Sequence, residues 1–313
     1  MHKYRADGSL GSSWHPWLRG NKLELPIQED ETALVLIALW MHYQESKQIE
    51  EIETLFNPLI RKAADFLSDY ISDDSGLPHP SYDLWEERYG ISTFTCGAVA
   101  EALRVSAEFS EILGKKILAQ KYRSRSQQIK EGVMKELFDP TEGHFIKMIE
   151  VSELGENSAD KTIDMSTFYA AFKFNLLPLN DERLTRFFSL VDETLKVPGN
   201  IGGYARYEND PYFRHSNSAF PNPWFITMLW MTQYHIAQAH SAKDLDIVLA
   251  NLNWVASHAS GAGILSEQLH PVTGEQLSAA PLTWSHAEYV VTIMEYLEKL
   301  RDLGICPDCL PPK

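Results

Sequence analysis

The stretch Ser81–Gly90 reads SYDLWEERYG. It lies in a loop, residues 72–90, and places the adjacent carboxylates Glu86 and Glu87 beside Trp85. Apolar residues with helical spacing occur on both sides of this loop. Long loops that carry acidic and aromatic side chains between helices indicate an all-α protein whose functional groups lie in its loops.

Helical periodicity extends along most of the chain, and the connections alternate between short turns and long loops. Strands and helices do not alternate, which argues against a parallel sheet. Paired helices with long loops on one side predict a toroid of helix hairpins whose loops gather at one end. About nine helices are predicted. Three of them start at Asp30, Asn57 and Ser92, and the other six cover residues 116–138, 164–174, 181–196, 222–240, 244–258 and 283–303.

Local signals mark several helix starts. Asp30 is a predicted N-cap, and Asn57-Pro58 and Asn222-Pro223 each combine a cap residue with proline at the first helical position. Residues 144–151 predict a short hairpin strand. The apolar stripes expected to be buried are Leu34, Ile37, Ala38 and Met41 in the first helix and Ala98, Ala102, Val105 and Phe109 in the helix after Ser92.

The composition limits the classes of partner. The chain has 313 residues, and 28 Lys and Arg against 43 Asp and Glu give a net charge of −15. This charge repels phosphate and anionic lipid, so we expect no nucleic acid and no membrane as partner. No apolar run approaches the roughly 20 residues of a membrane span, and no signal peptide is evident. We expect a cytoplasmic protein if this start is genuine; secretion stays open for a longer chain.

No metal site and no cofactor are predicted. Cys306 and Cys309 form a C-x-x-C near the end, but no second Cys or His pair has the spacing of a zinc site, so we expect an inert tail. Paired ligand spacing is also missing around His15, His215, His270 and His286.

Two carboxylates suit glycoside hydrolysis, which needs a proton donor for the leaving oxygen and a second carboxylate for water or the sugar. Glu86 suits the acid, because Trp85 limits its hydration and Glu87 adds a like charge, and both effects favour the protonated form. Glu267, in a second long loop at residues 260–281, suits the base.

A third long loop places Arg206 between Tyr204 and Tyr207. The planar guanidinium suits paired sugar hydroxyls, and either tyrosine suits stacking on a sugar ring. Each feature alone is more often structural: a Glu-Glu pair before a helix commonly compensates the helix dipole, and an arginine among aromatic rings commonly packs against them.

Five blocks taken together resemble a known family, the glucoamylases of family fifteen of the glycoside hydrolases, in the prokaryotic branch that includes glucodextranase. They occur in the family's order over nearly the whole chain. The blocks are Leu25–Leu34, Tyr82–Glu87, Gly203–Tyr207, Asn222–Phe225, and Ser266–Gln268 together with Leu282–Ser285.

The resemblance implies an (α/α)6 barrel and an inverting, exo-acting hydrolase that releases glucose from the non-reducing ends of α-glucans or malto-oligosaccharides. It assigns Glu86 as general acid and Glu267 as general base. It places Glu87, Trp85 and Arg206 at sugar-binding positions, Trp284 at a supporting position, and either Trp14 or Trp17 at the pocket tryptophan. Tyr204, which suits stacking on a sugar ring, is the remaining candidate substrate-binding residue.

The start of the chain departs from the family pattern. The family carries an Arg-Asp pair that grips the terminal glucose, and no such pair precedes Gln28, since Arg5-Ala6-Asp7 does not match. The resemblance therefore implies that residues 1–313 form a single catalytic-barrel domain with about nine of twelve helices. On this interpretation its N-terminal helices and a preceding β-sandwich domain are missing, and the missing segment is a candidate partner.

Two other functions are considered. One is a catalytically inactive carbohydrate-binding remnant that keeps the aromatic loops. The other is a different helical toroid, such as a terpene cyclase, which the lack of a DDxxD-like run disfavours. The residues leave α-1,4, α-1,6 and α,α-trehalose linkages open. An inverting pair predicts that the carboxyl groups of Glu86 and Glu267 stand about 6.5–9.5 Å apart.

Overall fold

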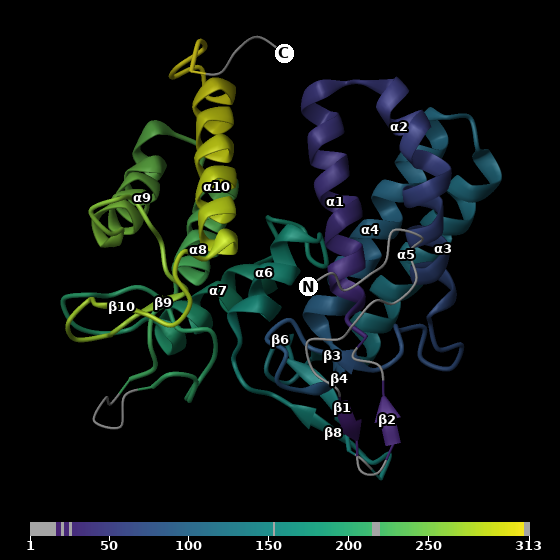
Figure 1. Ribbon diagram of the computed structural model, residues 1–313, viewed down its shortest axis with the longest axis horizontal. Helices are drawn as coiled ribbons and strands as arrows, with labels where there is room; N and C mark the ends of the chain where they lie inside the picture. The colour runs from purple at the N-terminus through teal and green to yellow at the C-terminus, as the bar shows by residue number, and fades with distance from the viewer. Residues whose placement is uncertain (1–16, 20–21, 25–26, 153, 215–219, 310–313) are drawn as a thin grey trace. The chain divides into compact units, whose positions relative to one another are not determined.

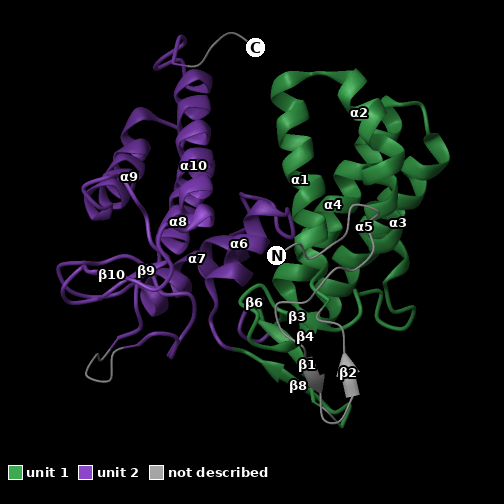
Figure 2. Cartoon of the chain, viewed as in Figure 1, with its two compact units in different colours: residues 1–140, 145–161 green, residues 141–144, 162–313 purple. Residues whose placement is uncertain are grey.

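The computed structural model describes residues 17–19, 22–24, 27–152, 154–214 and 220–309. The chain divides into two compact units (Figure 2). Unit 1 consists of residues 1–140 and 145–161, and unit 2 consists of residues 141–144 and 162–313. Helices dominate both units. The prediction of one barrel domain over residues 1–313 stays a prediction, and each unit is described by itself.

Unit 1 is a helical layer above a small antiparallel sheet, whose strand order is β3-β4-β7-β8. Its elements are β1 (Trp17–Arg19), β2 (Lys22–Glu24), α1 (Glu29–Ser46), α2 (Ile49–Leu55), the π-helix η1 (Phe56–Ile60), α3 (Arg61–Asp69), β3 (Ser81–Tyr82), β4 (Tyr89–Ser92), α4 (Thr93–Ile112), α5 (Lys116–Glu136), β5 (Phe138–Asp139), β7 (Met148–Val151) and β8 (Asn157–Asp160). The short strand β6 (His144–Phe145) lies where the chain passes from one unit to the other.

Helix α4 is the centre of unit 1 and lies beside α1 and α5 (Figure 1). Ser92 caps it as predicted, since its hydroxyl accepts a hydrogen bond from the Thr95 N–H at 3.4 Å. The predicted stripe is confirmed, because all four of its residues are fully buried, although α4 is buried on most of its other faces too. A helix enclosed in this way carries a broader apolar surface than one stripe.

The prediction for α1 is wrong in two respects. Gln28 occupies the N-cap, so Asp30 lies in the first turn and is buried. The buried stripe contains Ala33 and Leu36, whereas Met41 is exposed. The face is rotated because α1 packs on α4 through aromatic residues further along: Trp40 and Tyr43 contact the ring of Phe109 with centroids 5.1 and 6.0 Å away.

Asn57-Pro58 does not begin a helix. Both residues lie inside η1, and α2, η1 and α3 run on without a break. Proline lacks the N–H that an α-helical interior needs, and the wider π-turn accommodates it. Counting these three elements as one, the described part of the chain holds nine continuous helical segments, as predicted.

Unit 2 contains α6 (Met165–Lys173), α7 (Glu182–Leu195), α8 (Phe225–Gln238), the 3-10 helix η2 (Ala242–Leu245), α9 (Asp246–His258), β9 (Gln268–Leu269), β10 (Gln276–Leu277) and α10 (Thr283–Asp302). Asp164 and Asp181 cap α6 and α7 by accepting backbone N–H bonds at 2.7 and 2.8 Å. Helix α8 lies between α9 and α10, packing against both. It begins at Phe225 with Trp224 as N-cap, two residues later than Asn222-Pro223 predicts.

The hairpin β3–β4 is held tightly against β7. Gly90 pairs with Glu150, and a Cβ added at Gly90 would lie 2.2 Å from the carbonyl oxygen of Ile149. Only glycine fits such a close backbone approach. The hairpin that ends the stretch Ser81–Gly90 is therefore fixed on the sheet. The predicted strand at 144–151 is present as β6 and β7.

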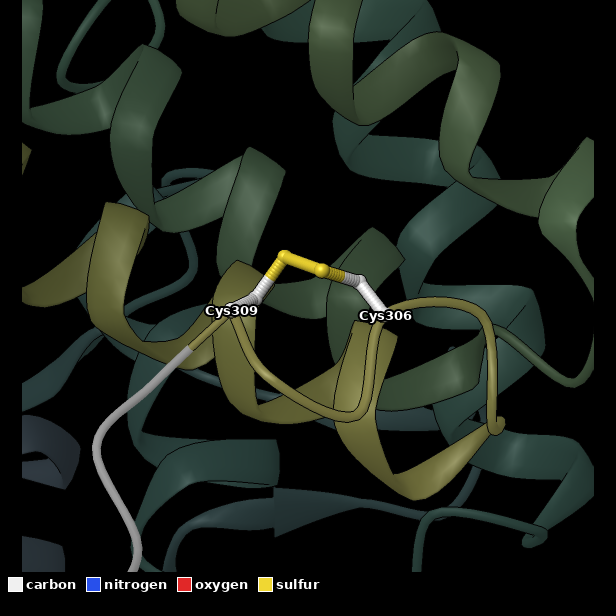
Figure 3. Close-up of a disulfide and its surroundings, with 2 residues drawn as sticks. All are labelled: Cys306 and Cys309. Carbon is white, nitrogen blue, oxygen red and sulfur yellow. A yellow bond between two sulfur atoms is a disulfide. The ribbon is translucent and has the colours of Figure 1, made fainter.

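The C-terminal cysteines do not form an open tail. Cys306 and Cys309 are disulfide-bonded and close the turn after α10 (Figure 3). Cys96 is buried and free. Among the described residues, none of the helices combines the length and apolar character that crossing a membrane requires. No group of three His, Cys, Asp or Glu in the same residues is arranged to hold a metal ion.

Candidate active site

Glu86 lies at the tip of the turn that joins β3 to β4. The turn is closed by backbone bonds from the Asp83 N–H to the Arg88 carbonyl and from the Glu86 N–H to the Asp83 carbonyl, both 2.9 Å. Glu86 has φ +59°, a left-handed conformation that glutamate rarely adopts. Its side chain is exposed. Strained backbone of this kind is retained where the surroundings impose it, and it often marks a functional position.

Asp83 organises this turn from beneath. Its carboxylate oxygen Oδ1 accepts the backbone N–H groups of Glu87 and Arg88 at 2.9 and 3.0 Å. The side chain is buried. This role of Asp83 was not apparent from the sequence, although an aspartate at the start of a turn commonly bonds the backbone a few residues on. Glu86 is therefore carried on a turn whose shape depends on one buried carboxylate.

The neighbours of Glu86 differ in exposure. Trp85 is 8% exposed, so little of its ring is open to stack on a sugar. Glu87 is exposed, like Glu86. The turn thus presents two adjacent carboxylates to solvent above a buried tryptophan.

Two further buried acids lie at the start of α1, close to this turn. Burial raises the pKa of Glu29 to about 7. Burial raises the pKa of Asp30 to about 8, with the charges of Glu29 and then Glu31 adding to the effect. Asp30 Oδ1 has no hydrogen-bond partner among the described residues. The connection to the turn is direct, because Gln28 Nε2 donates to the Asp83 carbonyl at 3.3 Å.

Glu267 of unit 2 is half-buried and lies just before β9. Its backbone is fixed, since its N–H donates to the Ala279 carbonyl at 3.0 Å and its carbonyl accepts from Phe225 at 3.4 Å. Its Oε2 accepts hydrogen bonds from the Ser278 hydroxyl and, at 3.5 Å, from Gln268 Nε2. These two donors hold the carboxylate in place. Ser278 was not apparent from the sequence.

Gln268 is fully buried and belongs to the scaffold. Its Oε1 accepts from Asn222 Nδ2 at 2.6 Å, and the same nitrogen donates to the Phe213 carbonyl at 3.1 Å. This network ties the Glu267 segment to the loop before α8. The Asn222-Pro223 dipeptide, which sequence analysis took as a helix start, thus contributes an amide that supports the site.

Arg206 is buried in a cage of aromatic rings. Its guanidinium lies 4.5 Å from the ring centre of Trp224 and 4.9 Å from that of Tyr212. Its fork donates to both carboxylate oxygens of Asp210, at 2.7 and 2.8 Å. A buried guanidinium requires such a counter-charge. The fork predicted to hold sugar hydroxyls therefore binds Asp210, a partner that lies four residues away and was not predicted.

The remaining predicted residues have mixed surroundings. Tyr204 is buried and donates its hydroxyl to Asp192; burial and this bond raise the pKa of Tyr204. Trp284 is half-buried at the start of α10, with its ring edge-on to Trp230 at 5.8 Å. Trp14 lies outside the described residues. Trp17 lies in β1, and its side chain is outside the described part.

The predicted residues form two groups. Trp85, Glu86 and Glu87 share one turn of unit 1. Arg206, Tyr204, Glu267 and Trp284 belong to unit 2. The separation of the Glu86 and Glu267 carboxyl groups stays a prediction.

Comparison with known proteins gives a consistent family. The model of the glycosyl hydrolases family 15 matches residues 15–254 and 250–294. An uncharacterized glycosyl hydrolase of Methanocaldococcus jannaschii is 30% identical over 93% of this chain and 45% of its own length. Trehalase 2 of Sulfolobus acidocaldarius is 25% identical over 89% of this chain and 44% of its own.

A bacterial glucoamylase solved as a complex with acarbose is similar in structure. The two structures superpose with a TM-score of 0.68, and the sequences are 23% identical. The match covers 88% of this chain and 41% of the glucoamylase chain. This likeness confirms the predicted all-α fold of the glucoamylase (α/α)6 type. The chain spans less than half the length of each of these three proteins.

Proposed function

Because this chain belongs to the glycosyl hydrolases family 15, we propose that it acts as an inverting, exo-acting glycoside hydrolase that releases glucose from the non-reducing ends of α-glucans. Glu86 is the proposed general acid and Glu267 the proposed general base. The observation that carries the proposal is the contrast between the two carboxylates. One is exposed on a strained turn, and the other is half-buried and accepts two side-chain hydrogen bonds.

This contrast suits the two roles. A general acid needs access to the leaving oxygen, and a general base needs to stay ionised while it activates water. The Ser278 and Gln268 donors fix the orientation of the Glu267 carboxylate. Glu87, Arg206, Tyr204 and Trp284 are the proposed substrate-binding or supporting groups, with Trp85 beneath the acid and Trp14 or Trp17 as a further pocket residue.

The experiment is to incubate the purified chain, supplemented with the Arg-Asp segment proposed below, with maltose and longer malto-oligosaccharides and to follow the products by proton NMR. We expect β-glucose as the first product, because an inverting enzyme converts an α-linkage into the β-anomer. First release of α-glucose would contradict inversion, and release of maltose or longer fragments would contradict exo-action. Glu275→Gln, an exposed carboxylate in the Glu267 loop, is the matched control variant and should leave the rate unchanged.

Trehalose is a second candidate substrate, supported by the similarity to Trehalase 2. The same NMR assay with α,α-trehalose separates the two, since a glucoamylase-like site favours maltose and a trehalase-like site favours trehalose. Binding of acarbose without hydrolysis of either sugar would favour the inactive carbohydrate-binding remnant.

We also propose a polypeptide partner, the segment that supplies the Arg-Asp pair expected to grip the terminal glucose. Without this pair a substrate would be poorly positioned even where both carboxylates are present. The chain alone should then hydrolyse maltose negligibly, and addition of such a segment should restore glucose release. Robust turnover by monomeric 1–313 would contradict this part of the proposal.

A further inference from the structure

We propose that Lys147 is a positioning residue for this reaction: its buried ammonium group keeps Asp83 ionised, and ionised Asp83 holds the turn that carries Glu86. The inference rests on the proposed function for its catalytic consequence. Its structural part concerns only unit 1 and is tested separately.

The backbone of Lys147 is fixed at the rim of the sheet. Its N–H donates to the Asp160 carbonyl at the end of β8, and its carbonyl accepts from the Thr93 N–H at the start of α4, each at 3.0 Å. A residue held by two elements in this way cannot move its Cα far without disturbing the sheet. The side chain is consequently directed from a rigid base.

The side chain of Lys147 reaches the underside of the turn. Its Nζ lies 4.0 Å from Asp83 Oδ2, and the two side chains are 6% and 3% exposed. At this distance the attraction is electrostatic rather than a hydrogen bond. Burial weakens screening, so a cation at this distance strongly favours the carboxylate form of Asp83.

The surroundings would otherwise protonate Asp83. Burial already keeps Glu29 and Asp30 protonated toward neutral pH. Without a nearby cation, the same burial would favour the protonated form of the neighbouring Asp83 carboxyl group. The charged and titratable groups around the turn are Glu29, Asp30 and Glu31 of α1, Cys96 of α4, Lys147, and Arg88 of the turn itself, whose guanidinium is 3.6 Å from Glu150 of β7.

Protonation of Asp83 would loosen the turn. Oδ1 accepts two backbone N–H bonds, from Glu87 and Arg88, and a carboxylate accepts such bonds more strongly than a neutral acid does. Glu86 is held with a positive φ between these bonds and the Asp83 carbonyl. Weaker bonds would allow Glu86 to relax from this conformation, and a displacement of about 1 Å is sufficient to slow catalysis about a hundredfold.

The activity test compares Lys147→Met with Lys147→Arg, Asp83→Asn and the double variant. We expect Lys147→Met to lower kcat about ten- to a hundredfold with KM changed less than about threefold, and Lys147→Arg to recover most of the loss. The acidic limb of its kcat/KM profile should move to higher pH, because Asp83 must now lose a proton first. Asp83→Asn, which mimics the protonated side chain, should lose as much activity. The double variant should be no slower than Asp83→Asn.

Lys161→Met is the matched control. Lys161 lies in the same unit and pairs with Asp139 at 2.6 Å, but its side chain is 58% exposed and lies outside the turn. This variant should keep the parental kcat. A Lys147→Met enzyme with full kcat, or losses that multiply in the double variant, would overturn the proposal.

A measurement without activity separates this inference from the proposed function. In protein labelled with ¹⁵N-arginine, the Arg88 amide reports on its bond to Asp83. In Lys147→Met, the chemical shift of the Arg88 amide, followed against pH, should show a titration step. This step should be missing from the parent and from the double variant Lys147→Met/Asp83→Asn. If the parent hydrolyses no glucoside even when the Arg-Asp segment is added, the proposed function fails while this step still decides the role of Lys147. Identical titrations in the parent and Lys147→Met would refute it.

Discussion

The two candidate carboxylates are supported in different ways. Beneath Glu86 lie buried ionisable groups, the carboxyls of Asp83, Glu29 and Asp30 with the ammonium of Lys147. Around Glu267, by contrast, the support comes from neutral donors, the Ser278 hydroxyl and the Gln268 amide. The first arrangement depends on which groups are protonated, whereas the second depends on hydrogen-bond geometry. The contrast teaches that pH should act on the support of Glu86 more than on the support of Glu267.

The buried charge of unit 2 fits this contrast. Arg206 is fully matched by Asp210, which accepts both donors of its fork. Arginine does not lose its proton over the usual pH range, so the charge of Arg206 is constant. Titratable groups of unit 2 are nevertheless affected by burial, which raises the pKa of Glu288 and lowers the pKa of His235.

The largest expected effect separates the two carboxylates chemically. Glu86→Gln should lose about two to four decades of kcat on maltose, the usual size of general acid catalysis. It should lose far less on p-nitrophenyl α-glucoside, whose leaving group needs no proton. Glu267→Gln should lose activity equally on both substrates, because water activation is required in each case. Equal losses of Glu86→Gln on the two substrates would remove Glu86 from the acid role.

The second effect concerns stability of unit 2. Asp210→Ala leaves the buried Arg206 without its counter-charge, which should cost about 3–5 kcal/mol of unfolding free energy. Lys196→Ala breaks the more exposed pair with Asp192, at 3.4 Å, and should cost at most about 1 kcal/mol. Urea unfolding of the three proteins measures both values. Similar losses of unfolding free energy in the two variants would mean that the buried pair of Arg206 and Asp210 stabilises the fold no more than the exposed pair does.

The third effect is the pH dependence of unit 1. Glu29 and Asp30 have folded-state pKa values of about 7 and about 8, above the ordinary 4.5 and 3.8. At these two groups the folded chain therefore binds more protons than the unfolded chain between about pH 4 and pH 8, so their contribution to stability falls as pH rises through this range. Each extra proton bound in the folded state lowers the unfolding free energy by up to about 1.4 kcal/mol per unit rise in pH.

Asp30→Asn tests this assignment. Its urea-unfolding free energy should change less with pH than that of the parent, because one of the two protons no longer binds. An equally steep decline in Asp30→Asn would place the linked proton elsewhere.

The smallest effect returns to Glu267. Ser278→Ala removes one donor to its carboxylate, and kcat/KM should fall about tenfold, since a hydrogen bond to a charged group is worth roughly 1.5 kcal/mol. Ser257→Ala, which removes an exposed hydroxyl of α9, serves as control and should change nothing. Unchanged kcat/KM in Ser278→Ala would indicate that the hydroxyl does not support the base.

Local signals predicted much of the fold. The Ser92 cap, the α4 stripe and the start of α10 at Thr283 depend on residues close in sequence, and the structure contains them. The α1 stripe was misassigned because its orientation is decided by Phe109 on α4, far along the chain. Asn57-Pro58 misled because a continuous helix accommodates it in a π-turn.

The candidate carboxylates could be proposed from the sequence, whereas the groups that support them could not. Glu86 and Glu267 stand in recognisable blocks, but Asp83, Lys147 and Ser278 act through contacts that only the folded chain creates. No spacing rule links Lys147 to a turn about sixty residues earlier. The functional side chains thus follow from local sequence, while the groups that tune them follow from tertiary structure.

The most direct test of the central claim is a crystal structure of the catalytically competent protein with acarbose bound. An acid–base pair in an inverting hydrolase predicts that the carboxyl groups of Glu86 and Glu267 stand about 6.5–9.5 Å apart on either side of the reacting sugar, with room for a water molecule. A separation near 5 Å would indicate retention instead. One beyond about 12 Å would contradict the assignment of Glu86 and Glu267 as a pair.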